Sequence, residues 1–112
     1  MNYSKYKAKK TMVNGIEFDS KKEANRYATL LLLEKSGRIK DLKLQPIYEL
    51  VPKFKKNGKS YRKTTYKADF EYFDTKLNKR VVEDVKGFKT DVYKLKKKLF
   101  EYKFEDLEIE EV

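Results

Sequence analysis

The sequence predicts an α/β fold in which a mixed sheet is flanked by two helices and preceded by a β-hairpin. Three observations lead to this prediction: two segments with helical spacing of apolar residues, strand-like segments between and after them, and two Asn-Gly turns. The chain has 112 residues, of which 14% are aromatic, so it can form one domain with a modest core. We therefore expect a single domain over residues 1–112.

The first expected element is a hairpin near the N-terminus. Asn14-Gly15 is a strong signal for a tight turn, and it joins the strand-like segments 9–13 and 16–18. Residues 1–18 are thus expected to form an N-terminal arm and hairpin.

A helix is expected next, from about residue 21 to residue 36. Ser20 and Glu23 have the spacing of a capping box at its start, and Gly37 suits the position after its end. The run from Leu30 to Leu33 is apolar nearly all round its helix turn, so it could serve a contact in a homodimer.

Three antiparallel strands are expected to follow, over residues 44–54, 61–73 and 80–86. Asn57-Gly58 turns the chain between the first two strands, and residues 74–79 form the loop before the third.

The last part of the chain predicts a helix and a strand. Thr90 can cap a helix over residues 91–104, and a short strand over residues 107–112 follows it. Because a helix connects it to strand 80–86, this last strand should run parallel to that strand. The expected order is helix, three antiparallel strands, helix, strand.

The charge of the chain is strongly positive. The formal net charge is +10, from 28 Lys and Arg against 18 Asp and Glu. Basic residues gather in residues 1–12, 53–67 and 86–98 and are interleaved with Tyr and Phe, whereas residues 101–112 are acidic. This pattern favours a polyanionic partner, and nucleic acid is the expected one. A lysine-rich solvated surface is the alternative explanation.

The composition also excludes several kinds of chemistry. The chain has no Cys and no His, so disulfides, thiolate nucleophiles, Ser–His pairs and imidazole metal sites are excluded. Catalysis would have to use carboxylates, Lys, Tyr, Ser, Thr or a hard ion bound by oxygen, such as Mg²⁺ or Mn²⁺. No segment approaches the length of a membrane span and the start is not of signal-peptide type, so we expect a soluble cytoplasmic protein without a membrane partner.

Strand spacing predicts a cluster of carboxylates. Asp84 and Lys86 share one face of their strand, whereas Glu83 faces the other side. If residues 74–79 form a simple hairpin loop, Asp69 lies directly opposite Asp84. The two negative charges would repel each other, and a bound divalent cation would offset this repulsion. A slip of one residue would pair Asp69 with Glu83 instead, or remove the carboxylate pair.

Two further side chains are candidates for the same place. The register of the second hairpin puts Pro46 opposite Asp69 and the Gln45 amide close by, where it could orient a water molecule or touch a phosphate. Glu23 has two interpretations: it completes a cap with Ser20, or it adds a third carboxylate to the cluster. The alternative for the whole set is a solvated sheet face with lysine partners. With a metal ion bound, the set could generate hydroxide from water and hold it with the lysine.

Several motifs occur in order over almost the whole chain. They read KKT near the start, DSKKEA at 19–24, LQP at 44–46, ADF at 68–70, VEDVKG at 82–87 and DVYKLKKKLFE at 91–101. This set resembles the PD-(D/E)XK nuclease superfamily and, within it, a small phage and prophage family of unknown function. It is also similar to transposon-end endonucleases and to archaeal-type Holliday junction resolvases. The resemblance implies a restriction-endonuclease-like αβββαβ core.

The resemblance further implies a divalent-metal-dependent DNA endonuclease, with branched or junction DNA as a substrate by analogy. The positions that match its catalytic and metal-binding residues are Glu23, Gln45, Asp69, Asp84 and Lys86. Among these, Glu23, Asp69 and Asp84 would bind Mg²⁺ or Mn²⁺, and Lys86 would be the lysine of the motif. Spacing favours Asp84 over Glu83 as the second ligand, and the choice stays open. The residue before Asp69 is Ala68 rather than Pro.

DNA contacts are expected from lysines in the basic blocks and from tyrosines that could stack on an unpaired base. These candidates are Lys63, Lys67, Lys89, Lys94, Lys97, Tyr61 and Tyr66. RNA is not excluded as a partner. Two alternative functions are a non-catalytic nucleic-acid-binding module on the same fold and a phage protein that binds a host protein through its charge.

Overall fold

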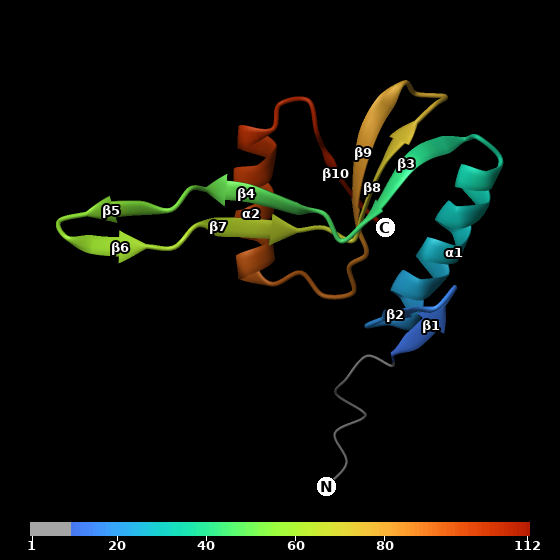
Figure 1. The fold of residues 1–112 in the computed structure, drawn as a ribbon, viewed down its shortest axis with the longest axis horizontal. Helices are drawn as coiled ribbons and strands as arrows, with labels where there is room; N and C mark the ends of the chain where they lie inside the picture. The colour runs from blue at the N-terminus through green and yellow to red at the C-terminus, as the bar shows by residue number, and fades with distance from the viewer. Residues whose placement is uncertain (1–9) are drawn as a thin grey trace, which may run out of the picture.

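Residues 10–112 are described by a computed structural model, in which two helices pack on opposite faces of a mixed sheet (Figure 1). Most of the basic block at residues 1–12, including Lys5, Lys7 and Lys9, lies outside the described residues. No helix within residues 10–112 is long and apolar enough to cross a membrane.

The central sheet has the strand order β10-β9-β8-β3. The strands β3 (Ile39–Leu44), β8 (Phe70–Asp74) and β9 (Lys79–Asp84) are antiparallel neighbours, and β10 (Ile109–Glu111) is parallel to β9. The predicted α/β class is therefore confirmed, as is the order of helix, three antiparallel strands, helix and parallel strand.

The prediction of two long strands, over residues 44–54 and 61–73, is wrong, because each segment is interrupted twice. The segment predicted as 44–54 divides into the end of β3, then β4 (Ile47–Val51) and the start of β5 (Phe54–Lys56). Gln45 has a φ of 49°, which takes the backbone out of the strand conformation just before Pro46. The returning segment divides in the same way into β6 (Lys59–Tyr61), β7 (Thr64–Lys67) and β8.

The start of β3 was not predicted at all. Its register with β8 shifts between Lys40 and Lys43, and Asp41 in that shift has a φ of 56°. A bulge of this kind interrupts the alternation of inward and outward side chains, which is the signal used to predict a strand.

Local signals fix the other elements close to the predicted positions. The hairpin of β1 (Thr11–Val13) and β2 (Ile16–Phe18) turns at Asn14 and Gly15, both of which have positive φ. Helix α1 (Lys21–Lys35) begins at the Ser20 cap and helix α2 (Asp91–Lys103) at the Thr90 cap, each one residue shorter at its end than expected.

Each face of the sheet has its own apolar core. Helix α1 and the first hairpin cover one face with residues that include Phe18, Tyr27 and Leu30, packed on Phe70 and Tyr72 of β8. Helix α2 covers the other face through a second set of residues, which includes Tyr66, Val82, Tyr93, Phe100 and Ile109. Most of the leucine run proposed for a homodimer contact is used in the first core, and only Leu32 is largely exposed, at 69%.

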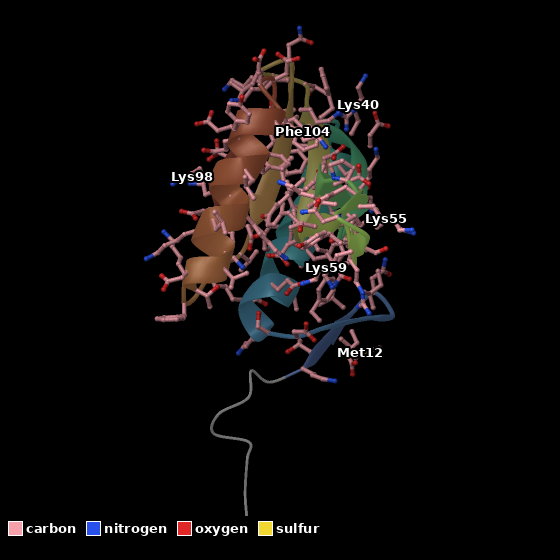
Figure 2. The ribbon with its side chains drawn as sticks, turned by 90° about the vertical axis from the view of Figure 1, so that its left-hand side faces the viewer. Met12, Lys40, Lys55, Lys59, Lys98 and Phe104 are labelled. Carbon is pink, nitrogen blue, oxygen red and sulfur yellow. The ribbon has the colours of Figure 1, made fainter. Side chains whose placement is uncertain are left out.

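A long hairpin extends from the sheet beyond α2 (Figure 1). Its near part, β4 paired with β7, contacts α2. Its far part, β5 paired with β6, has no other strand beside it within residues 10–112. Figure 2 looks toward the end of this hairpin, where the Lys55 side chain points into solvent away from α2.

Replacing Phe70, which is fully buried between α1 and the sheet, tests the first core. Phe70→Ala should lower the free energy of unfolding by about 3–5 kcal/mol, because it removes a large apolar side chain and leaves a cavity. Urea denaturation measures this change. Phe88→Ala is the matched control, since Phe88 is 82% exposed. Equal effects of the two substitutions would contradict the described core.

Candidate functional site

The pairing of β8 with β9 brings Asp69 beside Asp84. Phe73 pairs with Arg80 and Phe70 with Glu83, which is the register expected from the sequence. One residue before Phe70, the Asp69 backbone N–H donates to the Glu83 carbonyl over 3.0 Å. The Asp69 carboxylate accepts a 2.6 Å hydrogen bond from the Val85 N–H through Oδ2. The side chain is thus fixed at the end of β9 next to Asp84.

The crowding of acids changes the protonation of Asp69. Burial raises the pKa of Asp69 to about 7, and the nearby charges of Asp84 and Glu23 act in the same direction. The Val85 hydrogen bond opposes this rise but does not cancel it. Asp69 and Asp84 are also close enough for a hydrogen bond between their side chains. The site therefore has an excess of negative groups that a cation would relieve.

Asp84 is held from two sides on the face of the sheet that α2 covers. The hydroxyl of Tyr66 donates to Asp84 Oδ2, and the Lys86 Nζ lies 3.2 Å from Asp84 Oδ1. Burial raises the pKa of Tyr66 above its usual value, so the hydroxyl stays protonated and keeps donating. Only 2% of Asp84 is exposed. The prediction that Asp84 and Lys86 share a face is confirmed.

Lys86 has a second support from α2. Its Nζ lies 4.2 Å from the centre of the Tyr93 ring, within the range of a cation–π interaction. Its backbone carbonyl accepts a 3.0 Å hydrogen bond from Lys22 at the start of α1. The ammonium is therefore held between Asp84 and an aromatic ring, while 27% of the side chain stays exposed to solvent.

Glu23 approaches the cluster from the start of α1. Its backbone N–H donates to the Ser20 hydroxyl over 3.1 Å, which is one half of the expected capping box. Its carboxylate receives no hydrogen bond from residues 10–112. Burial raises the pKa of Glu23, with smaller contributions from Asp19 and Asp84, and Lys86 opposes the rise. Glu23 therefore caps with its backbone and leaves its carboxylate near the cluster.

Glu83 belongs to a different structure on the opposite face of the sheet. Arg26 of α1 makes two hydrogen bonds to it, at 2.7 Å from Nε and 2.5 Å from a terminal nitrogen. The Tyr72 hydroxyl donates to Glu83 as well. Glu83 is 1% exposed and is bound on this face by Arg26 and Tyr72, so Asp84 is the one of the two carboxylates that lies with Asp69 and Lys86.

The expected position of Gln45 is wrong by one residue. Its backbone N–H donates to the Asp69 carbonyl over 2.9 Å, so Gln45 itself lies opposite Asp69, and Pro46 pairs with Ala68. The predicted register does hold at the tip, where Lys56 pairs with Lys59. A bulge between Glu49 and Val51 then shifts it by one residue. Gln45 is exposed beside the cluster.

The predicted DNA contacts divide into three groups. Lys63, Lys67 and Lys94 are exposed, and Tyr61 is 39% exposed. Lys89 and Lys97 are engaged by Glu111, at 2.9 and 3.9 Å. Tyr66 is wrong as a stacking residue, because it is buried under α2 and its hydroxyl is bonded to Asp84.

The sequence did not reveal three contacts around these acids: Arg26 binds Glu83 on the opposite face, Tyr66 binds Asp84, and Tyr93 lies beside Lys86. Arg26 directly precedes Tyr27, one of the apolar positions of α1. A charged residue beside the buried face of a helix suggests that it has a buried partner of opposite charge, and this signal could have been used. Tyr66 lies on the same strand face as Ala68, whereas Asp69 follows it by three residues. Strand spacing therefore gave no reason to expect the Tyr66 hydroxyl near the aspartates.

The donors of the site suit a hard cation. The carboxylates of Asp69 and Asp84 lie near enough to raise the pKa of Asp69, Glu23 adds a third acid nearby, and all the candidate donor atoms are oxygens, as Mg²⁺ and Mn²⁺ prefer. Within the described residues 10–112, no three acidic side chains are already grouped as a complete ligand set. The residues present therefore fit a divalent ion held by Asp69 and Asp84, with Glu23 as a side chain that would have to turn toward it.

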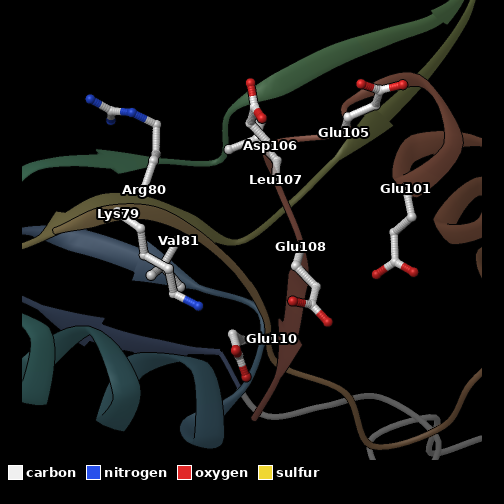
Figure 3. Close-up of a pocket in the computed structure, with 9 residues that line it drawn as sticks. All are labelled: Lys79, Arg80, Val81, Glu101, Glu105, Asp106, Leu107, Glu108 and Glu110. Carbon is white, nitrogen blue, oxygen red and sulfur yellow. The ribbon is translucent and has the colours of Figure 1, made fainter. Parts of the chain in front are cut away.

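A pocket of about 350 Å³ lies at the other end of β9 from Asp84 (Figure 3). Its walls come from the start of β9, the end of α2 and β10. Most of its lining side chains are acidic, namely Glu101, Glu105, Asp106, Glu108 and Glu110. It has no part in the carboxylate cluster.

The fold and the site define an α/β domain with a carboxylate–lysine cluster at one end of its sheet. The family "Protein of unknown function (DUF1064)" matches residues 3–112, and the chain belongs to this family. No curated protein and no solved structure matches the chain.

The raised pKa of Asp69 predicts a pH dependence of stability in metal-free buffer. The folded state binds a proton between pH 3.8 and about 7 that the unfolded chain has released, so stability should fall as the pH rises through this window. Asp69→Asn should therefore be more stable than the wild type at pH 8, and the difference should vanish near pH 4. Urea titrations at both pH values measure this, with the exposed Asp106→Asn as control. A variant that is less stable at both pH values would contradict the assignment.

The Arg26–Glu83 pair allows a second stability test. Arg26→Ala should lower the free energy of unfolding by about 3–5 kcal/mol, because it leaves a buried carboxylate without its counter-charge. Adding Glu83→Gln to this variant should recover part of the loss, since the remaining group is neutral. Urea unfolding of the two single variants and the double variant gives the coupling. A loss below about 1 kcal/mol, as for an exposed pair, would show that the charges are not buried.

Proposed function

We propose that this protein is a Mg²⁺- or Mn²⁺-dependent nuclease of the PD-(D/E)XK type that hydrolyses phosphodiester bonds in DNA. The observation that carries the proposal is the convergence of Asp69, Asp84 and Lys86 at the end of β9. Asp69 comes from another strand than Asp84 and Lys86, and the charges of the two aspartates repel each other, so placing them side by side is costly for stability alone. Such a cost is typical of a functional site.

Each residue of the cluster has a distinct role in this proposal. Asp69 and Asp84 would hold the ion, and Glu23 would join them from α1. The bound ion would supply an acidified water molecule and stabilise negative charge on the phosphate. The Lys86 ammonium would hold the attacking water or the developing charge, and Tyr66 would orient Asp84 through its hydrogen bond. The exposed Gln45 amide would contact the phosphate or a water molecule beside the cluster.

The charge of the surface supports a nucleic acid as the substrate. Lys67 is exposed two residues before Asp69, Lys63 is exposed further along the long hairpin, and Lys94 is exposed on α2. Branched DNA is a substrate to be tested along with linear DNA, and RNA belongs in the same comparison. A DNA substrate would place the action of the protein in the cytoplasm of a bacterial host cell.

One observation favours a second function, a DNA-binding module without catalysis. Within residues 10–112 the acidic groups do not form a complete ligand set, and Lys86 already neutralises Asp84 at 3.2 Å. In such a module the cluster would be a structural remnant. The basic surface would be kept because it does not depend on a metal.

Cleavage and metal binding separate these two functions. Wild-type protein with Mn²⁺ should cut at least one of linear, nicked, flapped and four-way DNA. Asp84→Asn and Lys86→Ala should each lower the rate by roughly a hundredfold or more, since each removes a charged group from the reacting centre. Both variants should still bind DNA within a few fold of wild type. The exposed Lys79→Ala is the control, because it lies at the other end of β9.

A second readout does not depend on activity. Mn²⁺ should raise the melting temperature of the wild type and should have a much smaller effect on Asp84→Asn. Tight DNA binding without cleavage by any divalent ion, together with no thermal effect of Mn²⁺, would leave the non-catalytic module as the function.

A further inference from the structure

The far part of the long hairpin is fully solvated. Every residue from Phe54 to Tyr61 is exposed, and Asn57 and Gly58 form its tip with positive φ values. We refer to residues 53–63 as the arm. No residue of the arm belongs to either apolar core. The arm therefore does not stabilise the fold through those cores, and a role in binding is the alternative.

The arm carries positive charge that nothing in the described chain neutralises. There is no acidic residue between Glu49 and Asp69, and the basic residues of the arm are Lys53, Lys55, Lys56, Lys59, Arg62 and Lys63. None of them forms an ion pair within residues 10–112. In contrast, Lys89 and Lys97 on the side of α2 are paired with Glu111. Other lysines, such as Lys94 and Lys98 of α2, form no ion pair within that range either, but α2 also carries Asp91 and Glu101, whereas the arm carries six basic residues and no acidic one.

The two faces of the arm differ. The rings of Phe54 and Tyr61 stack at 4.7 Å with an angle of 9° between their planes, and the next pair on the same face is Lys56 with Lys59. The Lys59 Nζ lies 5.3 Å from the Tyr61 ring centre. This face combines an apolar base with a cationic tip. The other face carries Lys55.

The arm is connected directly to the carboxylate cluster. The hairpin runs from Gln45 opposite Asp69 through β4 and β7 into β5 and β6. A strand rises about 3.3 Å per residue, so the chain from Asp69 to the tip at Gly58 can span at most about 36 Å along the ribbon. This length equals about one helical turn of B-DNA, which is about 34–36 Å.

We propose that the arm inserts into the major groove of duplex DNA, about one helical turn from the phosphodiester held at Asp69 and Asp84. The major groove, about 12 Å wide, admits a two-stranded ribbon as it stands, whereas the minor groove of about 6 Å would first have to be widened by bending the DNA. The ammonium groups contact the phosphates on both walls, and the Phe54–Tyr61 base of the arm contacts apolar base edges such as thymine methyl groups. Duplex DNA is then the substrate class, and only the position of the cut bond rests on the proposed function.

Binding to a 30-base-pair duplex without divalent ions tests the arm independently of cleavage. Replacing Lys55, Lys56 and Lys59 with Ala should weaken binding about tenfold or more at low salt. The slope of log affinity against log salt should fall by about 0.9 for each lost phosphate contact. The matched control replaces Lys35, Lys76 and Lys79 with Ala. These three substitutions remove the same amount of charge near the opposite end of the sheet. An equal loss in both triple variants would overturn the proposal, since only net charge would then matter.

Dimethyl sulfate identifies the groove, because guanine N7 lies in the major groove. Wild type should protect N7, the arm variant should lose this protection, and both should keep the same melting temperature. Protection of adenine N3 alone would indicate the minor groove and overturn the proposal. The proposal would also be overturned if the arm variant lost affinity for single-stranded DNA but not for the duplex. Mapping the cut in Mn²⁺ should place the protected guanines about ten base pairs away. N7 protection without any cutting would support the arm and contradict the nuclease, whereas cutting unaffected by the arm variant would do the reverse.

Discussion

The pairing of β8 with β9 is the constraint on which the rest of the site depends. Side chains alternate across a strand, so a slip of one residue would exchange Glu83 and Asp84 between the two faces of the sheet. The buried Glu83 prevents this slip, because Arg26 of α1 and Tyr72 of β8 bind it on one face. Asp84 is thereby fixed on the other face, next to Asp69. A structural ion pair on one side of the sheet thus determines where the carboxylate cluster lies on the other side.

The cluster tolerates its like charges because each acid has a specific donor. Asp69 accepts from the Val85 N–H, and Asp84 accepts from Tyr66 and lies against the Lys86 ammonium. These partners offset the charge only in part, since the pKa of Asp69 stays raised to about 7. A site that binds a cation needs this balance: enough donors to keep the fold intact, and enough uncompensated charge to favour the ion.

Local signals in the sequence were sufficient for much of this structure. The Asn-Gly turns, the Ser20 and Thr90 caps and the loop before β9 fixed the hairpins, the helix starts and the register of Asp69 with Asp84. The bends at Asp41 and Gln45 and the bulge after Glu49 could not be predicted, because they depend on how the sheet and α2 divide one long hairpin between them. The partners of Glu83 and Asp84 were equally hidden, since Arg26 and Tyr66 reach them only through the packing of the two cores on opposite faces of the sheet.

The bend at Gln45 has a consequence for how charge is arranged in the molecule. It directs the hairpin away from the sheet at the residue opposite Asp69, so the acidic cluster lies at the base of the hairpin whose end is the basic arm, with the separate ladders β4–β7 and β5–β6 between them. A polyanion attracted to the arm is thereby drawn along the ribbon toward carboxylates that would repel it. In the proposed function, a cation bound at the cluster would lower that repulsion. If both proposals hold, the same hairpin would make attraction by the arm and charge compensation at Asp69 and Asp84 two requirements of a single binding event.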